Sequence, residues 1–242
     1  DVLARGARLL PRARQLRASL RRSGDDLLLV IEGGEHWPRA RAFADAVSMV
    51  AATWWVSDHG VRRLVLDRRT VRDPGASFAQ VNAAVAAQLA AHVESLVMAH
   101  APATVVDAYA GTGDLAVSLA ARGVAVTAVE LDDAASTWCA ERLVAPSRAI
   151  AARVEEVMAG LLPADVVLLN PPRAGVASVV TDVLASSDPR PRAIVYVSCD
   201  PATLARDVAR LPGWRVASLV CFDMFPQTAH VETVCELVPE AA

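Results

Sequence analysis

The sequence predicts an α/β fold in which helices cover both faces of a mainly parallel β-sheet. From Gln80 onward, short runs of Val, Leu and Ile alternate with helical stretches, which is typical of strand–helix–strand units. In addition, 54% of the 242 residues are hydrophobic, so the chain can bury a full core. A strong turn at Asp73-Pro74-Gly75 precedes this region. We therefore predict a small α+β annex at residues 1–75 and a main domain at residues 76–242.

The annex is expected to mix helices and strands. Residues 1–22 contain seven Arg and predict a basic helix, with Pro11 as a break or restart. Residues 27–31 are an apolar run that ends at two glycines, as a strand followed by a turn would. The other expected elements are a helix at 38–50 and strands at 53–56 and 61–66.

The main domain is expected to begin with a long Ala-rich helix at 81–98. The expected strands are 104–109, 124–130, 165–170, 193–198, 215–222 and 232–238, with a short one near 148–152. The expected helices are 114–122, 133–143, 175–185 and 202–210. Ligands bind at the carboxyl ends of the strands in such sheets, so the loops that follow the strands should hold the site.

Charge and cysteine content exclude several classes of protein. The net charge of −3 does not indicate nucleic-acid binding by the whole surface. The Arg-rich start of the annex is either a contact surface for RNA phosphates or a solvated helix face. The four cysteines form no C-x-x-C pair and have no His at ligand spacing, so neither a metal nor an iron–sulfur cluster is expected.

Neither a membrane helix nor an export signal is expected from the residues given. No apolar run reaches the roughly 18 residues that a membrane helix needs, and no signal peptide is evident. We expect a cytoplasmic protein with no membrane partner. Because the chain begins at Asp1 rather than at Met, it is expected to be a piece of a longer protein.

A glycine-rich turn follows the first strand of the main domain, in the segment Asp107-Ala-Tyr109-Ala-Gly111-Thr-Gly113-Asp114. Such glycines let the backbone approach a ligand at the positive end of the next helix. Glu130 ends the following strand, where a carboxylate can hold both hydroxyls of a ribose. Both nicotinamide-binding and SAM (S-adenosylmethionine)-binding folds share this pairing, and a tight turn without a ligand is the alternative.

The segment Asp165-Val-Val-Leu-Leu-Asn170-Pro171-Pro172-Arg173 stops a buried strand at its carboxyl end. Two prolines fix the backbone after Asn170, so its amide is held in place and could read the edge of a flipped base. Dehydrogenases have no need of this element, which favours a methyltransferase. Alternatively, Asn170 only caps the turn.

Cys199 stands between a strand and a helix, in the segment Tyr196-Val-Ser198-Cys199-Asp200-Pro201. A thiol near a helix N-terminus gains thiolate character, while Asp200 and Pro201 suit the first helical turn. Cys139, Cys221 and Cys235 lie within predicted elements and are expected to be small buried residues.

The last motif is a polar loop between two strands, Phe222-Asp-Met-Phe-Pro-Gln227-Thr-Ala-His230-Val-Glu232. Glu232 is a candidate general base, with an exposed carboxylate at a strand edge as the alternative. His230 is expected to orient the loop.

Together these segments resemble the RNA uridine-5-methyltransferases, SAM-dependent enzymes that make 5-methyluridine in transfer or ribosomal RNA. The resemblance runs from about Ser77 to Val238 and includes a segment like the family's F-x-Q-x-N. It implies a Rossmann-like class I SAM-dependent methyltransferase sheet, mostly parallel with an antiparallel last strand. It places Cys199 as the nucleophile and Glu232 as the base. The expected SAM-site residues are Gln80, Tyr109, Gly111, Gly113, Asp114, Glu130 and Asn170, and the expected RNA-binding residues are Asn170, Arg173, Gln227 and His230.

Four departures from the family pattern are visible. Asn170 stands where the family usually has Asp, and Asp114 where it usually has Asn. The N-terminal cysteine cluster of some members and the small β-barrel RNA-binding domain of many are absent from this sequence. These two absences put RNA affinity of the chain alone in doubt.

The resemblance implies attack of the Cys199 thiolate on carbon 6 of uracil, after which carbon 5 takes the methyl group and Glu232 removes the carbon 5 proton. An amide at Asn170 can accept from N3–H and donate to O4 of uracil, yet the reversed amide matches cytosine equally well. A 5-methylcytosine enzyme therefore remains an alternative, as does a non-catalytic SAM- or RNA-binding relic. Enzymes that methylate exocyclic amino groups share Asn-Pro-Pro but typically follow it with an aromatic residue, and here Arg173 follows.

Overall fold

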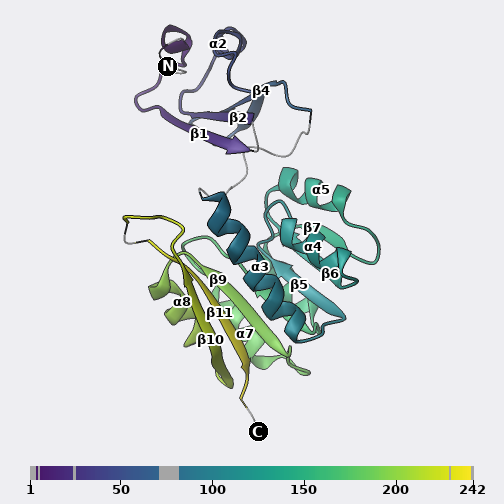
Figure 1. Ribbon diagram of the computed structural model, residues 1–242. Helices are drawn as coiled ribbons and strands as arrows, with labels where there is room; N and C mark the ends of the chain where they lie inside the picture. Colours follow the sequence, from purple (N-terminus) through teal and green to yellow (C-terminus); the bar gives the residue numbers. More distant parts are fainter. Residues whose placement is uncertain (1–3, 5, 24–25, 71–81, 229, 241–242) are drawn as a thin grey trace. The chain divides into compact units, whose positions relative to one another are not determined.

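The computed structural model describes residue 4 and residues 6–23, 26–70, 82–228 and 230–240. The chain divides into two compact units, Asp1–Phe78 and Ala79–Ala242 (Figure 1). The predicted domain boundary at residue 75 and the Asp73-Pro74-Gly75 turn lie outside the described residues.

The first unit is a four-stranded sheet with helical cover on one face. Its strand order is β1-β2-β3-β4, with β2 and β3 parallel and the other pairs antiparallel. Apolar side chains of β2 and β3, among them Ile31 and Trp55, pack with Phe43 and Val47. The elements are η1 (Ala7–Leu9), β1 (Arg17–Ser23), β2 (Asp26–Glu32), α2 (Ala40–Ala46), β3 (Ala52–Val56) and β4 (Arg62–Asp67).

The predicted basic helix at residues 1–22 is wrong. Residues 17–23 form strand β1, which pairs along its whole length with β2 from Arg17↔Glu32 to Ser23↔Asp26. Before this strand, the described residues 4 and 6 are helical and Ala7–Leu9 form a short 3₁₀ turn. The apolar strand β2 needs a partner for its backbone hydrogen bonds, and this requirement overrides the local helix propensity of the Arg-rich segment.

The second unit is a seven-stranded sheet with the order β10-β11-β9-β8-β5-β6-β7. Strands β9, β8, β5, β6 and β7 are parallel, and β11 is antiparallel to both of its neighbours. The predicted α/β architecture, a mostly parallel sheet with an antiparallel last strand and a small N-terminal α+β annex, is confirmed. The strands are β5 (Thr104–Ala108), β6 (Ala125–Glu130), β7 (Arg148–Ala151), β8 (Val166–Leu169), β9 (Ala193–Ser198), β10 (Trp214–Phe222) and β11 (Glu232–Pro239).

Helices cover both faces of this sheet (Figure 1). On one face, residues of three helices such as Val93, Leu119 and Cys139 pack against the strands. On the other face, residues such as Met158 and Leu184 form a second cluster around Tyr196 of β9. The helices are α3 (Ala83–Ala99), α4 (Asp114–Ala121) and α5 (Asp133–Arg142) on the first face, and α6 (Val154–Leu161), α7 (Ser178–Ser186) and α8 (Pro201–Val208) on the second. The expected elements omitted α6.

The topology gathers the predicted motifs at one edge of the sheet. The parallel strands β5, β6, β8 and β9 share a direction, so the loops after them lie at the same edge. Because β11 runs the opposite way, its first residue, Glu232, also lies at this edge. The candidate site is therefore built from loops that are far apart in sequence.

Candidate active site

The glycine turn after β5 has the backbone geometry that the sequence implies. Gly111 and Gly113 adopt positive φ values of 57° and 76°, and Tyr109 does so as well, at 64°. Gly113 precedes α4, and a Cβ there would overlap Cys139 Sγ and lie 2.7 Å from Cys139 Cβ. Gly113 is thus required both by its conformation and by its packing against α5.

Glu130 at the end of β6 holds the same turn. Its Oε2 accepts a hydrogen bond from Gly111 N at 2.9 Å, and its Oε1 accepts one from Asp132 N at 2.8 Å. Each carboxylate oxygen has two lone pairs, so both retain capacity for a further donor. Glu130 therefore positions the glycine turn and still presents acceptors at the edge of the sheet.

Asp107, within β5, is a candidate site residue that the sequence reasoning missed. Its carboxyl group is 3% exposed, and its Oδ2 has no hydrogen-bond partner among the described residues. Burial, followed by repulsion from Glu130, raises the pKa of Asp107 from 3.8 to about 7. A buried acceptor without a donor beside a glycine turn fits the ammonium or hydroxyl groups of a bound ligand.

Tyr109 and Asp114 lie on either side of the glycine turn. Tyr109 is half-buried, and its burial, together with the charges of Glu155 and Asp207, raises its pKa to about 12. Asp114 begins α4, where its Oδ1 lies 2.7 Å from Arg142 Nη2 and its Oδ2 accepts from Thr112 Oγ1 at 3.0 Å. Asp114 thus connects the turn to α5 while its side chain stays 74% exposed.

Asn170 directly follows β8, and its side chain is exposed. Its backbone N–H donates to Ala108 O at 3.3 Å, which continues the pairing of β8 with β5. Further along the loop, Gly175 N donates to Pro172 O at 2.8 Å and closes a turn. The loop backbone is therefore ordered around an amide that faces solvent.

Cys199 lies between β9 and α8 and is partly exposed. Asp200 is the N-cap of α8: its Oδ1 accepts from Ala202 N at 2.9 Å and from Thr203 N at 3.0 Å. Ser198 Oγ accepts from Asp200 N at 3.2 Å. The thiol is thus accessible and stands next to a capped helix N-terminus, as predicted.

Glu232 is the first residue of β11 and is only 3% exposed. The expected alternative, an exposed carboxylate at a strand edge, does not hold. Thr233 is the register partner of Ser198 on β9, and its Oγ1 donates to Ser198 O at 2.8 Å. Cys199 follows Ser198 and Glu232 precedes Thr233, so the two candidates flank the last register pair of these strands.

The loop before β11 contains the other predicted side chains. Gln227 has a positive φ of 64°, and both Gln227 and His230 are exposed. The His230 ring lies edge-on to Phe225, with ring centroids 6.1 Å apart. Phe225 in turn packs against the core cluster under α3. The role of His230 in orienting the loop stays a prediction.

The remaining cysteines differ in their surroundings. Cys139 and Cys235 are buried as expected, and burial raises the pKa of each thiol to about 11. Cys221 on β10 is exposed, so its predicted burial is wrong. β10 is the edge strand of the sheet, which leaves one side of it open. Gln80 lies outside the described residues.

Two further features of the described residues bear on the class of protein. No helix in that part of the chain is long and apolar enough to cross a membrane. Nor does any group of three or more His, Cys, Asp or Glu side chains gather there in a way that could hold a metal ion.

The architecture matches a solved structure, that of the tRNA (uracil-54, C5)-methyltransferase of Pyrococcus abyssi in complex with S-adenosyl-L-homocysteine. The TM-score is 0.69 at 26% sequence identity, and the match covers 92% of this chain and 60% of that one. The chain therefore has the fold of the SAM-dependent methyltransferases.

Sequence comparison finds similar proteins of one kind. Residues 147–238 match the family model described as tRNA (uracil-5-)-methyltransferase. A 23S rRNA (uracil(747)-C(5))-methyltransferase from Shewanella amazonensis is 34% identical over 69% of this chain and 44% of its own length. An RNA methyltransferase described as uncharacterized, from Thermosynechococcus vestitus, is 34% identical over 81% of this chain and 44% of its own. The chain is thus a relative of the RNA uracil-5-methyltransferases, and it spans about 44% of the length of these relatives.

Proposed function

We propose that this chain transfers a methyl group from SAM to carbon 5 of a uridine in transfer or ribosomal RNA. The observation that carries this proposal is the placement of an accessible thiol, Cys199, and a buried carboxylate, Glu232, around the last register pair of β9 and β11. Directly opposite residues in an antiparallel pair share a face of the sheet. If the pairing continued by one residue, Cys199 would lie opposite Glu232, and their side chains would share a face of the sheet.

In the proposed reaction the Cys199 thiolate attacks carbon 6 of uracil and forms an Sγ–C6 bond, and the electrons of the C5=C6 double bond move toward carbon 5 and O4. SAM, when bound, supplies the methyl group that carbon 5 takes up. Glu232 then removes the carbon 5 proton, the C5=C6 bond forms again, and the Sγ–C6 bond breaks to return the thiolate. A buried carboxylate suits this role because it is shielded from water.

The residues proposed to hold SAM are those around the glycine turn. The unpartnered Oδ2 of Asp107 and the remaining acceptor capacity of Glu130 fit a ligand that carries an ammonium group and ribose hydroxyls. Tyr109, Gly111, Gly113, Asp114 and Asn170 line the same edge of the sheet, and Gln80 is proposed by resemblance. Asn170, Arg173, Gln227 and His230 are proposed to contact the RNA.

The test is incubation of the protein with labelled SAM and unmodified RNA, followed by digestion to nucleosides. We expect the label in 5-methyluridine. Label in 5-methylcytidine would support the alternative that Asn170 leaves open, and label in N6-methyladenosine would contradict both. Absence of label with SAM still bound would favour a non-catalytic relic, or dependence of RNA binding on residues beyond this chain.

A further inference from the structure

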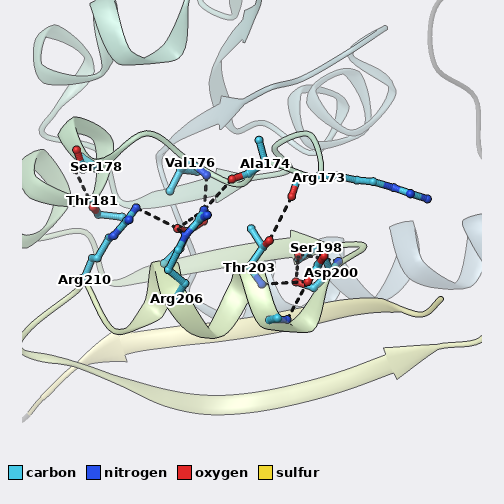
Figure 2. Close-up of polar contacts among 12 residues, drawn as sticks. Arg173, Ala174, Val176, Ser178, Thr181, Ser198, Asp200, Thr203, Arg206 and Arg210 are labelled. Atoms are coloured by element: carbon cyan, nitrogen blue, oxygen red, sulfur yellow. Dashed lines mark hydrogen bonds and ion pairs between the residues drawn. The ribbon is translucent and has the colours of Figure 1, made fainter. Parts of the chain in front are cut away.

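Side chains of helix α8 bind the loop that follows Asn170 through the backbone of residues 173–176 (Figure 2). Thr203 Oγ1 donates to Arg173 O at 3.2 Å, and Arg206 Nη2 donates to Ala174 O at 2.7 Å. Val176 N donates to Asp207 Oδ2 at 3.0 Å. Three of the four residues at 173–176 are thus bound through their backbone to one helix, and Cys199 lies two residues before that helix begins.

Gly175, the fourth of these residues, is fixed by packing. A Cβ at Gly175 would overlap Asp207 Oδ2 and would lie 2.5 Å from both Arg206 Nη2 and Thr203 Cγ2. Its φ of +78° is also one that other residues rarely adopt. The backbone of loop residues 173–176 is therefore in direct contact with side chains of α8, with no space between them.

The Asp207 carboxylate is the centre of this contact. It is fully buried and accepts from Tyr196 Oη at 2.7 Å in addition to Val176 N. Its Oδ1 accepts from Arg206 Nε at 2.9 Å and Nη2 at 2.8 Å, and Arg210 Nη1 lies 3.4 Å away. One carboxylate thus joins the loop after β8, the strand β9 and the helix α8.

Stability alone does not account for this arrangement. A buried carboxylate is costly to desolvate even when two Arg side chains pair with it, and apolar replacements of buried ion pairs are often neutral or stabilising. A charged network of this kind does fix one geometry, because each hydrogen bond has a preferred direction. The geometry fixed here is that between the loop of Asn170 and the segment of Cys199, which follow the neighbouring parallel strands β8 and β9.

We propose that helix α8, through Thr203, Arg206 and Asp207, is a positioning element that holds the loop after Asn170 and so sets the recognised base at the correct distance from the Cys199 thiol. This inference rests on the proposed function, in which Asn170 contacts the base and Cys199 attacks it. The Arg173 side chain itself extends away from these contacts (Figure 2), so the helix binds only its backbone and leaves the guanidinium available for RNA.

The experiment uses two pairs of variants of the full chain. Thr203→Val removes the hydroxyl that holds Arg173 O, and its control is Thr181→Val, which removes a similar 2.7 Å bond to Ser178 O inside α7. Arg206→Lys cannot contact both Asp207 and Ala174 O as the guanidinium does. Its control is Arg190→Lys, whose guanidinium also binds carbonyl oxygens, those of Gly213 and Ala185, away from the loop.

For each variant we measure kcat and KM for methylation of RNA, the affinity for S-adenosyl-L-homocysteine, and the rate of covalent adduct formation with RNA that contains 5-fluorouridine. Because fluorine replaces the hydrogen at carbon 5, the base finds no proton to remove and the adduct accumulates. We expect Thr203→Val and Arg206→Lys to lower kcat and the adduct rate by about 10- to 100-fold, the size expected for a misplacement of about 1 Å. KM and the affinity for S-adenosyl-L-homocysteine should stay within about twofold of wild type, and both controls should react at the wild-type rate.

The inference is wrong if wild type makes 5-methyluridine while Thr203→Val and Arg206→Lys react as fast as their controls. It is also wrong if the affinity for S-adenosyl-L-homocysteine falls in proportion to kcat, since the network would then act through the cofactor site. If wild type makes no 5-methyluridine at all, the proposed function fails and this inference fails with it.

Discussion

The hydroxyl of Thr233 on β11 donates to the carbonyl oxygen of Ser198 on β9 at 2.8 Å. Both residues are buried, at 2% and 5% exposure, and they form the last register pair of the two strands. A one-residue slip would move every side chain of β11 to the other face of the sheet. The bond therefore fixes the register at the end of the strands that lies next to the candidate site. Cys199 and Glu232 are the next residues outward, and their relation depends on this register.

The first prediction separates the proposed roles of these two residues. Cys199→Ala should abolish both methylation and adduct formation, because no thiolate remains to attack carbon 6. Glu232→Gln should still form the adduct but release it about 10²- to 10⁴-fold more slowly, because the base is missing. A covalent complex with unmodified RNA, visible on a denaturing gel, is the measurement.

Cys221→Ser is the control for this experiment, since Cys221 is an exposed thiol on the edge strand β10, opposite Thr233, and has no role in the proposed reaction. It should methylate RNA at the wild-type rate. Residual activity of Cys199→Ala, or loss of activity in Cys221→Ser, would contradict the assignment of the nucleophile.

A second prediction concerns base recognition by Asn170. Removing its amide in Asn170→Ala deletes two hydrogen bonds to uracil, worth about 1–3 kcal/mol together, so kcat/KM should fall by about 10- to 100-fold. The measurement is methylation of RNA with a single target uridine, compared with the same RNA carrying cytidine. Gln88→Ala, which removes an exposed amide from α3, should leave both rates unchanged. An Asn170→Ala variant as active as Gln88→Ala would show that the amide does not read the base.

The alternation of strands and helices in the second unit was predictable, because each strand is a short apolar run that ends at a turn signal. β9 was expected at 193–198 and is found at Ala193–Ser198, and the other strands agree to within about two residues. The same reasoning failed at β1, where a polar, Arg-rich segment becomes a strand only by pairing with β2. It also omitted the short helix α6.

The candidate site was predictable only where a residue stands in a recognisable motif. Cys199 and Asn170 follow apolar strands and could be found in this way. Asp107 could not, because within a strand sequence nothing distinguishes a buried carboxylate from an exposed one. Asp207 likewise reads as an ordinary helix residue, and its role depends on contacts with β9 and with the loop after β8.

A third prediction tests the packing of the glycine turn. Gly113→Ala should destabilise the protein by roughly 2–4 kcal/mol, because it adds a clash with Cys139 to the cost of a positive φ. Gly123→Ala is the matched control: its φ is +88°, but a Cβ there meets nothing within 4 Å. It should lose only about 1–2 kcal/mol. Urea denaturation measures both, and equal losses would show that the contact with Cys139 has no energetic effect.

The last prediction concerns pH. The pKa of Asp107 is raised by burial from 3.8 to about 7 in the folded chain. The folded state therefore holds this proton more tightly than the unfolded state. The stabilisation that Asp107 gains from holding this proton is fully present below about pH 4. As the pH rises toward 7 this stabilisation is lost, by at most about 1.4 kcal/mol of unfolding free energy per pH unit. In Asp107→Asn the amide carries no charge at any pH, so this loss should disappear.

The free energy of unfolding, measured in urea at pH 5, 6, 7 and 8 without added cofactor, should fall more steeply for wild type than for Asp107→Asn. Asp165→Asn is the control, because hydrogen bonds from the backbone of Thr104 and Ala103, with the charge of Arg192, lower the pKa of Asp165. A carboxyl group with a lowered pKa loses its stabilising effect only as the pH falls into the acid range, so Asp165→Asn should keep the wild-type slope between pH 5 and 8. If Asp107→Asn also keeps that slope, the buried carboxyl group does not titrate near neutral pH. The Asp107 carboxylate would then be charged throughout this range, and a bound ligand would have to donate the hydrogen bond to its Oδ2.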